Sequence, residues 1–151
     1  KKLREKARCR GREMAEAYSQ ANSAQRMGDC WGAQEYRQQG DAHKSAMEEF
    51  DERAARIIFR ENNKDRKNGG KIDLHGLFVA EAVGLANQLL QYGESRGDQV
   101  IRTNLGKGKH SDAGRARIRP ALEDLCTEQG LGHSLDPHNA GVLIVRLNRR
   151  R

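Results

Sequence analysis

Residues 71–106 read KIDLHGLFVAEAVGLANQLLQYGESRGDQVIRTNLG, and this stretch decides the fold. The run KIDLHG predicts a short β-strand that Gly76 closes, and DQVIRTNLG predicts a second strand that ends near Gly106. Strand, helix and strand in this order favour two parallel neighbouring strands joined by a crossover helix. The helix is predicted because apolar residues recur at helical spacing, with one face formed by Phe78, Ala82, Leu85, Leu89 and Tyr92.

The residues that follow add a helix and two strands. The run GKGKHSDAG (residues 106–114) is typical of a loop, and residues 115–129 predict a helix whose early turns are restricted by Pro120. GHSLD and GVLIVRL predict two strands on either side of the turn PHNAG. The complete order, βαβαββ, predicts a two-layer α/β sandwich of about four strands with both helices packed on the sheet.

A helical segment precedes this sandwich. Residues 1–63 contain no proline and keep their apolar residues at helical spacing, and MGDCWG (residues 27–32) supplies a turn. We therefore expect an antiparallel helical hairpin over residues 1–66, with Trp31 in its core. The rest of the predicted organisation is a linker at residues 67–71, the sandwich at residues 72–148 and a basic tail at residues 149–151.

Two short motifs carry the candidate chemistry. Asp73 and His75 are two residues apart, so on an extended strand their side chains project from the same face. The second motif, GKGKH, follows the second strand; its glycines let backbone amides approach an anion, and its lysines add positive charge. If the two strands are parallel, both motifs lie beyond the carboxyl ends of strands, where open sheets place their sites.

This combination of residues suits a phosphodiester. The carboxylate and the imidazole would transfer protons or hold a metal-bound water, and His110 would be a second proton donor or a phosphate contact. A base and an acid on either side of one phosphate can cleave RNA without a metal by using the neighbouring 2′-hydroxyl, a route that is closed to DNA. The candidate catalytic residues are Asp73, His75 and His110, and the candidate substrate-binding residues are Gly106, Lys107, Gly108, Lys109, Arg102 and Arg115.

The charge distribution favours an anionic partner. The 151-residue chain has a net charge of +7, and two clusters hold most of the excess. Residues 1–12 contain seven Lys and Arg and one acidic residue, and residues 102–119 contain six and one. Such clusters bind phosphate backbones through counterion release. The first cluster also fits an ordinary solvated helix surface, whereas the second surrounds the glycine-rich loop.

Composition argues against a membrane protein, a secreted protein and a zinc-binding protein. No apolar run approaches the roughly 18–20 residues of a membrane span, and no signal peptide is visible. Cys9, Cys30 and Cys126 lack the paired spacing of a zinc site or a disulfide framework, so we expect reduced, structural thiols in an intracellular protein and no metal-binding residues. The residues alone leave open whether GKGKH is a phosphate loop or a surface loop, and whether Asp73 only forms a turn.

The stretches IDLHGL, GKGKHS and HSLDPHNAGVLIVRL resemble the small MutS-related (Smr) domain over residues 71–148. Its hallmark motifs, Asp-x-His-Gly and Gly-x-Gly-x-His-Ser, occur in order, with Ile72 where leucine is common and Leu105 where threonine is common. Residues 3–63 resemble the helical segment of unassigned function that often precedes this domain in eukaryotic proteins.

The resemblance implies nuclease activity or nucleic-acid binding. Some relatives nick or cleave DNA, and eukaryotic relatives with the helical segment are linked to mRNA cleavage at stalled ribosomes. By motif, Asp73 and His75 would be the catalytic pair, and Gly106, Lys107, Gly108 and His110 would form the substrate-binding loop.

We therefore expect a cytoplasmic endoribonuclease module in mRNA quality control, with an RNA or DNA phosphate backbone and the ribosome as partners. A DNA-nicking enzyme and a non-catalytic RNA- or ribosome-binding module are the alternatives. Members of the family differ in their need for a divalent metal, so the cofactor is left open.

Overall fold

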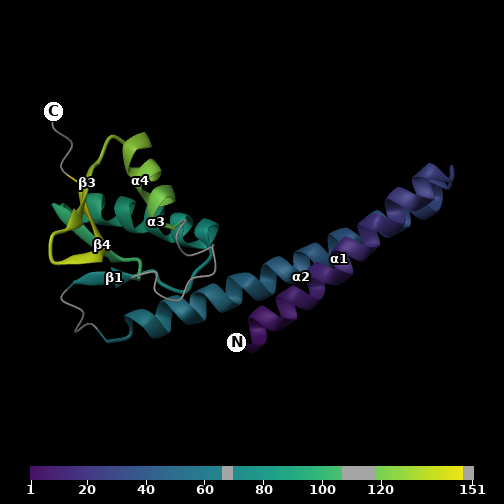
Figure 1. The fold of residues 1–151 in the computed structure, drawn as a ribbon, viewed down its shortest axis with the longest axis horizontal. Helices are drawn as coiled ribbons and strands as arrows, with labels where there is room; N and C mark the ends of the chain where they lie inside the picture. Colours follow the sequence, from purple (N-terminus) through teal and green to yellow (C-terminus); the bar gives the residue numbers. More distant parts are fainter. Residues whose placement is uncertain (66–69, 107–117, 148–151) are drawn as a thin grey trace. The chain divides into compact units, whose positions relative to one another are not determined.

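A computed structural model describes residues 1–65, 70–106 and 118–147 (Figure 1). The chain divides into two compact units, Lys1–Arg56 and Ile57–Arg151. None of the helices in the described ranges is both long and apolar enough to cross a membrane. The elements in chain order are α1 (Lys2–Arg26), α2 (Cys30–Asn63), β1 (Lys71–Asp73), α3 (Val79–Arg96), β2 (Val100–Asn104), α4 (Ile118–Glu128), β3 (Gly132–Asp136) and β4 (Asn139–Arg146).

The first unit is a hairpin of α1 and most of α2. Arg4 binds Asp51 at 2.6 Å and the Tyr18 hydroxyl donates to Asp41 at 2.6 Å, so the two helices run antiparallel. Asp29 caps α2, because its Oδ1 accepts the Gly32 N–H at 2.9 Å. The buried residues of this unit are all small, which lets the two helix backbones approach closely: Ala7, Ala17, Ala21, Ala24, Ala33, Gly40, Ala54 and Ala55.

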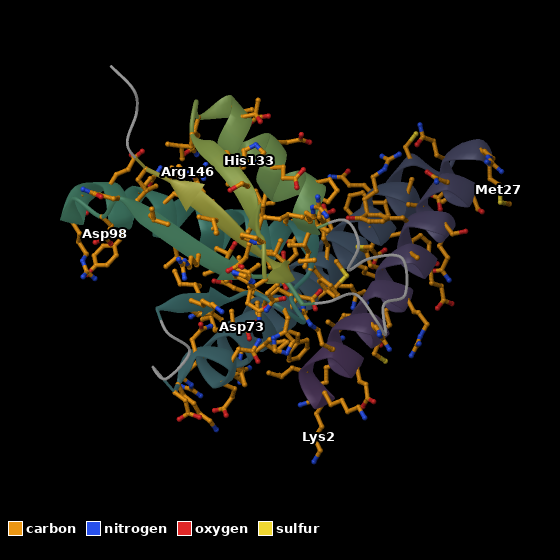
Figure 2. The ribbon with its side chains drawn as sticks, turned by 60° about the vertical axis from the view of Figure 1, so that its left-hand side comes forward. Lys2, Met27, Asp73, Asp98, His133 and Arg146 are labelled. Carbon is orange, nitrogen blue, oxygen red and sulfur yellow. The ribbon has the colours of Figure 1, made fainter. Side chains whose placement is uncertain are left out.

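The expectation that Trp31 belongs to the core is wrong. Trp31 is 81% exposed, and Met27, four residues earlier in the sequence, is 85% exposed. Figure 2 shows Met27 projecting from the end of the hairpin. The buried stripe of α2 includes Ala33, Gly40 and Ala54, which are spaced by multiples of seven residues. Trp31 precedes Ala33 by two residues, which places it about 200° away around the helix.

The second unit is the predicted βαβαββ sandwich (Figure 1). Its four strands are ordered β1-β2-β4-β3. β1 pairs with β2 in parallel, and β4 runs antiparallel to both β2 and β3. Ile101, Thr103, Leu143 and Val145 point to the face on which α3 and α4 pack, and they line one core with Ala86, Leu89, Leu90, Leu122, Leu125 and Cys126. The expected fold class is therefore confirmed.

The predicted buried face of α3 is wrong in part. Phe78 precedes the helix and is 52% exposed, and Tyr92 is 60% exposed, whereas Ala82, Ala86, Leu90 and Gly93 are buried. The helix turns its small residues toward the sheet because it lies close to it: a Cβ at Gly93 would be 2.7 Å from Ile101 Cδ1. The two large aromatic side chains are consequently left at the margin of the interface.

The three cysteines are free but do not share one environment. Cys126 is buried in the core of the sandwich, and burial raises the pKa of its thiol. Cys9 and Cys30 are exposed on the hairpin. The expectation of structural thiols therefore suits Cys126 and is wrong for the other two.

Candidate functional site

The candidate site lies where β1 and β2 end side by side. The two strands are parallel, and Asp73, the last residue of β1, stands opposite Asn104, the last residue of β2. Parallel strands bring their carboxyl ends to one edge of the sheet, so the polar residues that follow each strand are brought together there. The parallel pairing of β1 and β2 therefore brings the two motifs to the same edge of the sheet.

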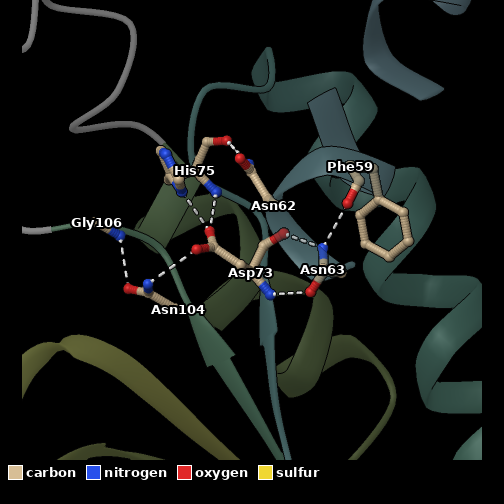
Figure 3. A network of polar contacts seen from close by, with 7 residues as sticks. All are labelled: Phe59, Asn62, Asn63, Asp73, His75, Asn104 and Gly106. Carbon is tan, nitrogen blue, oxygen red and sulfur yellow. Dashed lines mark hydrogen bonds and ion pairs between the residues drawn. The ribbon is translucent and has the colours of Figure 1, made fainter. Parts of the chain in front are cut away.

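Asp73 and His75 form a close pair (Figure 3). Asp73 Oδ1 lies 2.5 Å from His75 Nδ1 and also accepts the backbone N–H of His75 at 2.9 Å. Asp73 is only 8% exposed, whereas half of the His75 side chain is exposed. A carboxylate can only accept, so the Nδ1 tautomer of histidine is the one that donates to it, and in that neutral tautomer Nε2 is an acceptor.

The route by which these two residues meet differs from the expected one. β1 ends at Asp73, and His75 lies in a turn beyond it rather than on an extended strand. The Asp73 carboxylate accepts the N–H of the residue two positions on, which is the hydrogen bond of an Asx-turn. Gly76, with φ at 81°, then reverses the chain in a conformation that favours glycine.

Asn104 joins the two motifs, and sequence reasoning missed it. Its Nδ2 donates to Asp73 Oδ2 at 3.2 Å, and its Oδ1 accepts the Gly106 N–H at 3.1 Å (Figure 3). Gly106 has φ at 79°, and a Cβ there would lie 3.5 Å from the Cβ of His75. The first glycine of the second motif thus stands directly beside the histidine of the first. The available signal was the parallel pairing itself, since it sets the last polar residue of one strand against that of the other.

Two further asparagines contact the first motif, and their role was also missed. Asn63 Nδ2 donates to the Asp73 carbonyl at 2.9 Å, and Asn63 Oδ1 accepts the Asp73 N–H at 2.8 Å. Asn62 Nδ2 donates to the His75 carbonyl at 2.8 Å. Both residues lie at the end of α2, of which they are the last two.

Of the predicted substrate-binding residues, Arg102 and Gly106 are described. Arg102 is exposed and points to the same side of β2 as Asn104, opposite Lys71 on β1. This side of the sheet is cationic: the pKa of Asp136 is held below its usual value by the backbone N–H of His138 and further lowered by Lys71 and Arg102. The other predicted site residues lie outside the described part of the chain: Lys107, Gly108, Lys109, His110 and Arg115.

In residues 1–65, 70–106 and 118–147, no three His, Cys, Asp or Glu side chains gather as a metal site would require. The described groups that contact the Asp73 carboxylate are the backbone N–H of His75, the ring of His75 and the side-chain amide of Asn104, and the side-chain amide of Asn63 binds the Asp73 main chain. The arrangement holds a carboxylate and a histidine in one fixed relation, which suits proton transfer.

The comparisons with known proteins agree with the fold and the motifs. The solution structure of the Smr domain of B3BP is 30% identical and matches with a TM-score of 0.50 over 63% of this chain and 93% of that domain. The chain therefore belongs to the Smr domain family. Residues 1–63 match the family described as a domain of unknown function (DUF1771), so the expected pairing of a helical segment with an Smr domain is confirmed.

Two curated relatives are similar to this chain over most of its length and are themselves longer than it. Endonuclease NBR9 of Saccharomyces cerevisiae is 32% identical over 85% of this chain, and NEDD4-binding protein 2 of Homo sapiens is 36% identical over 71% of it. The chain spans 53% of the yeast protein and 6% of the human one.

Proposed function

We propose that this chain is an endoribonuclease module that cleaves the RNA backbone by using the 2′-hydroxyl next to the scissile phosphate. The observation that carries the proposal is the His75–Asp73 pair, with 2.5 Å between Nδ1 and Oδ1, at the joined ends of two parallel strands. A histidine held by a buried carboxylate is the arrangement that other enzymes use to abstract a proton from a hydroxyl group. The name of the yeast relative, an endonuclease, supports the reaction class.

In the proposed reaction His75 acts as the general base and Asp73 holds it in position. Nε2 takes the proton of the 2′-hydroxyl, the 2′-oxygen attacks phosphorus, and the bond from phosphorus to the 5′-oxygen breaks. His110 gives a proton to the departing 5′-oxygen. The products are a 2′,3′-cyclic phosphate and a 5′-hydroxyl, and the negative charge of Asp73 stabilises the imidazolium that forms in between.

The RNA backbone would be bound by the glycine-rich loop and the cationic side of the sheet. Gly106 is beside His75, and we assign the phosphate being cleaved to the motif that begins at this glycine, with Lys107 and Lys109 as its positive charges. Arg102 would contact a neighbouring phosphate, and Arg115 is assigned to the backbone as a further substrate-binding residue. Each such contact makes affinity fall as salt rises.

The test compares three substrates of one sequence: an RNA, the same RNA with a single 2′-deoxy residue, and the DNA. The RNA should be cut in the presence of EDTA, with a cyclic phosphate at the new 3′ end, and the deoxy position should resist cleavage. His75→Ala and Asp73→Asn should each slow cleavage by about 100-fold or more. His138→Ala, an exposed histidine outside the site, serves as the matched control.

Two results would overturn this function. Cleavage of the DNA would indicate a nicking enzyme, and salt-dependent binding with no cleavage would indicate a nucleic-acid-binding module. We extend the proposal to cytoplasmic mRNA on stalled ribosomes, as the family resemblance implies. Cleavage of ribosome-bound mRNA should then be faster than cleavage of the same free RNA. Equal rates would contradict the extension to ribosome-bound mRNA.

A further inference from the structure

The end of α2 supplies β1 with the hydrogen-bond donor and acceptor that a neighbouring strand would otherwise supply. β1 is at the edge of the sheet, with β2 as its partner on one side. The Leu74 N–H donates to the Asn104 carbonyl of β2, so the N–H and C=O of the preceding residue, Asp73, point to the opposite, outer edge. Both groups bind the single side-chain amide of Asn63, at 2.8 and 2.9 Å (Figure 3).

Asn63 is itself held in place by its helix. The same Nδ2 group that donates to Asp73 also donates to the Phe59 carbonyl one turn earlier in α2, at 2.8 Å. Both of its N–H donors are therefore used, and its orientation is set by the helix backbone. Asn62 adds a second link two residues further along the motif, to the His75 carbonyl. The two asparagines together bind the main chain at both ends of Asp73–His75.

This contact bears directly on the catalytic pair. The Asp73 carboxylate receives three hydrogen bonds, from the His75 N–H, from His75 Nδ1 and from Asn104 Nδ2. All three depend on where the main chain places the Asp73 Cα, since the side chain is short. A carboxylate that is displaced by even about 1 Å would no longer align the histidine, and misplacement on that scale can cost about 100-fold in rate.

We propose that Asn62 and Asn63, the last two residues of the segment of unknown function, are positioning residues of the Smr site. The segment thereby has a role within the site: its final turn completes the edge of the sheet and sets the main chain of the Asp-x-His motif. The functional unit in this chain begins at the end of α2 and not at β1. The proposal deepens the proposed function and rests on it for its consequence in catalysis.

The contact itself is tested by amide hydrogen exchange in the full chain. Asn63→Ala should speed exchange of the Asp73 amide by about tenfold, because that amide loses its acceptor. The Leu105 amide, which donates to the Gly141 carbonyl in the same sheet, should keep its rate. Glu61→Gln is the matched control, because Glu61 is exposed on the same turn and contacts Lys64. Unchanged exchange at Asp73, or equal acceleration of both amides, would contradict the proposal.

The catalytic consequence is tested on the RNA substrate. Asn63→Ala should lower kcat by about 10- to 100-fold and leave KM and RNA affinity unchanged, because it touches neither phosphate nor base. Asn62→Ala should have a smaller effect of the same kind, and Glu61→Gln none. A fall in affinity with unchanged kcat would assign these residues to binding instead. If the unaltered chain does not cleave RNA, the proposed function fails, whereas the exchange result at Asp73 still decides whether the asparagines position the motif.

Discussion

The hairpin of residues 1–56 and the sandwich that follows it bury different kinds of side chain. Every buried apolar residue of the hairpin is an alanine, whereas the largest fully buried side chains among the described residues all lie in the sandwich: Leu74, Ile118, Leu143, Val142 and Cys126. Close approach of the two helix backbones stabilises the hairpin. The sandwich is stabilised by the large apolar surface that it removes from water. The hairpin should therefore be sensitive to added volume, and the sandwich to removed volume.

Thiol labelling should show the largest contrast between the two units. Cys9 and Cys30 of the hairpin are exposed, and Cys126 is buried with a raised thiol pKa. We expect Cys126 to react with iodoacetamide at pH 8 on the order of a thousandfold more slowly, because reaction must wait for local opening. Mass spectrometry of timed samples measures the rates. Three equal rates would mean that the core around α4 is open to solvent.

Removing volume from the sandwich should have the next largest effect. Leu143→Ala leaves a cavity between the sheet and its helices, so we expect a loss of about 2–5 kcal/mol in the unfolding free energy of this unit. Val100→Ala, at a side chain that is 46% exposed, should cost less than about 1 kcal/mol. Urea denaturation followed by amide signals of β2 and β4 makes the measurement. Similar losses for the two variants would contradict the packing described.

Adding volume to the hairpin should also destabilise it. A Cβ at Gly40 would lie 2.5 Å from the ring of Tyr18, whose hydroxyl binds Asp41. Gly40→Ala should therefore cost about 1–3 kcal/mol in the hairpin, although alanine is the better helix former. Amide exchange along α1 and α2 reports the change for this unit alone. A stabilised hairpin would show that the helices can move apart at no cost.

The smallest expected effect is a gain from the same substitution at another helical glycine. Gly84 lies within α3, and a Cβ there would meet nothing within 4 Å. Gly84→Ala should therefore stabilise the sandwich by about 0.5–1 kcal/mol through helix propensity. Thermal unfolding followed by circular dichroism should show a raised midpoint. Opposite changes in stability at Gly40 and Gly84 would show that close packing decides the first and helix propensity the second. Changes of the same sign would contradict this difference between the two glycines.

The order of elements could be predicted from the sequence, but the packed faces could be predicted only in part. Turn residues and the change of apolar period mark each strand and helix, and these are local properties of the chain. The buried stripe of α3 was misjudged because Phe78 and Tyr92 are apolar, yet the close approach at Gly93 turns the small residues inward. Trp31 was misjudged for a related reason, since apolar character does not say whether a partner covers it.

The residues of the candidate site could likewise be predicted from the sequence only in part. Asp73, His75 and Gly106 were predicted from their motifs, and the described chain brings all three together. Asn104 and Asn63 were not predicted, because an asparagine at the end of a strand or helix is an ordinary terminating residue. Their contacts with Asp73 join residues that are 31 and 10 positions apart, and no local pattern signals such a contact.

The sequence by itself determined the element order, the resemblance to the Smr family and the two motifs, because strand, helix and turn preferences act over a few residues. The tertiary structure alone decided that an Asx-turn pairs His75 with Asp73, that Asn104 links both motifs, and that the end of α2 completes the edge of β1. Such contacts depend on strand register and on which backbone groups an edge strand leaves unpaired. These properties arise only when distant segments pack together.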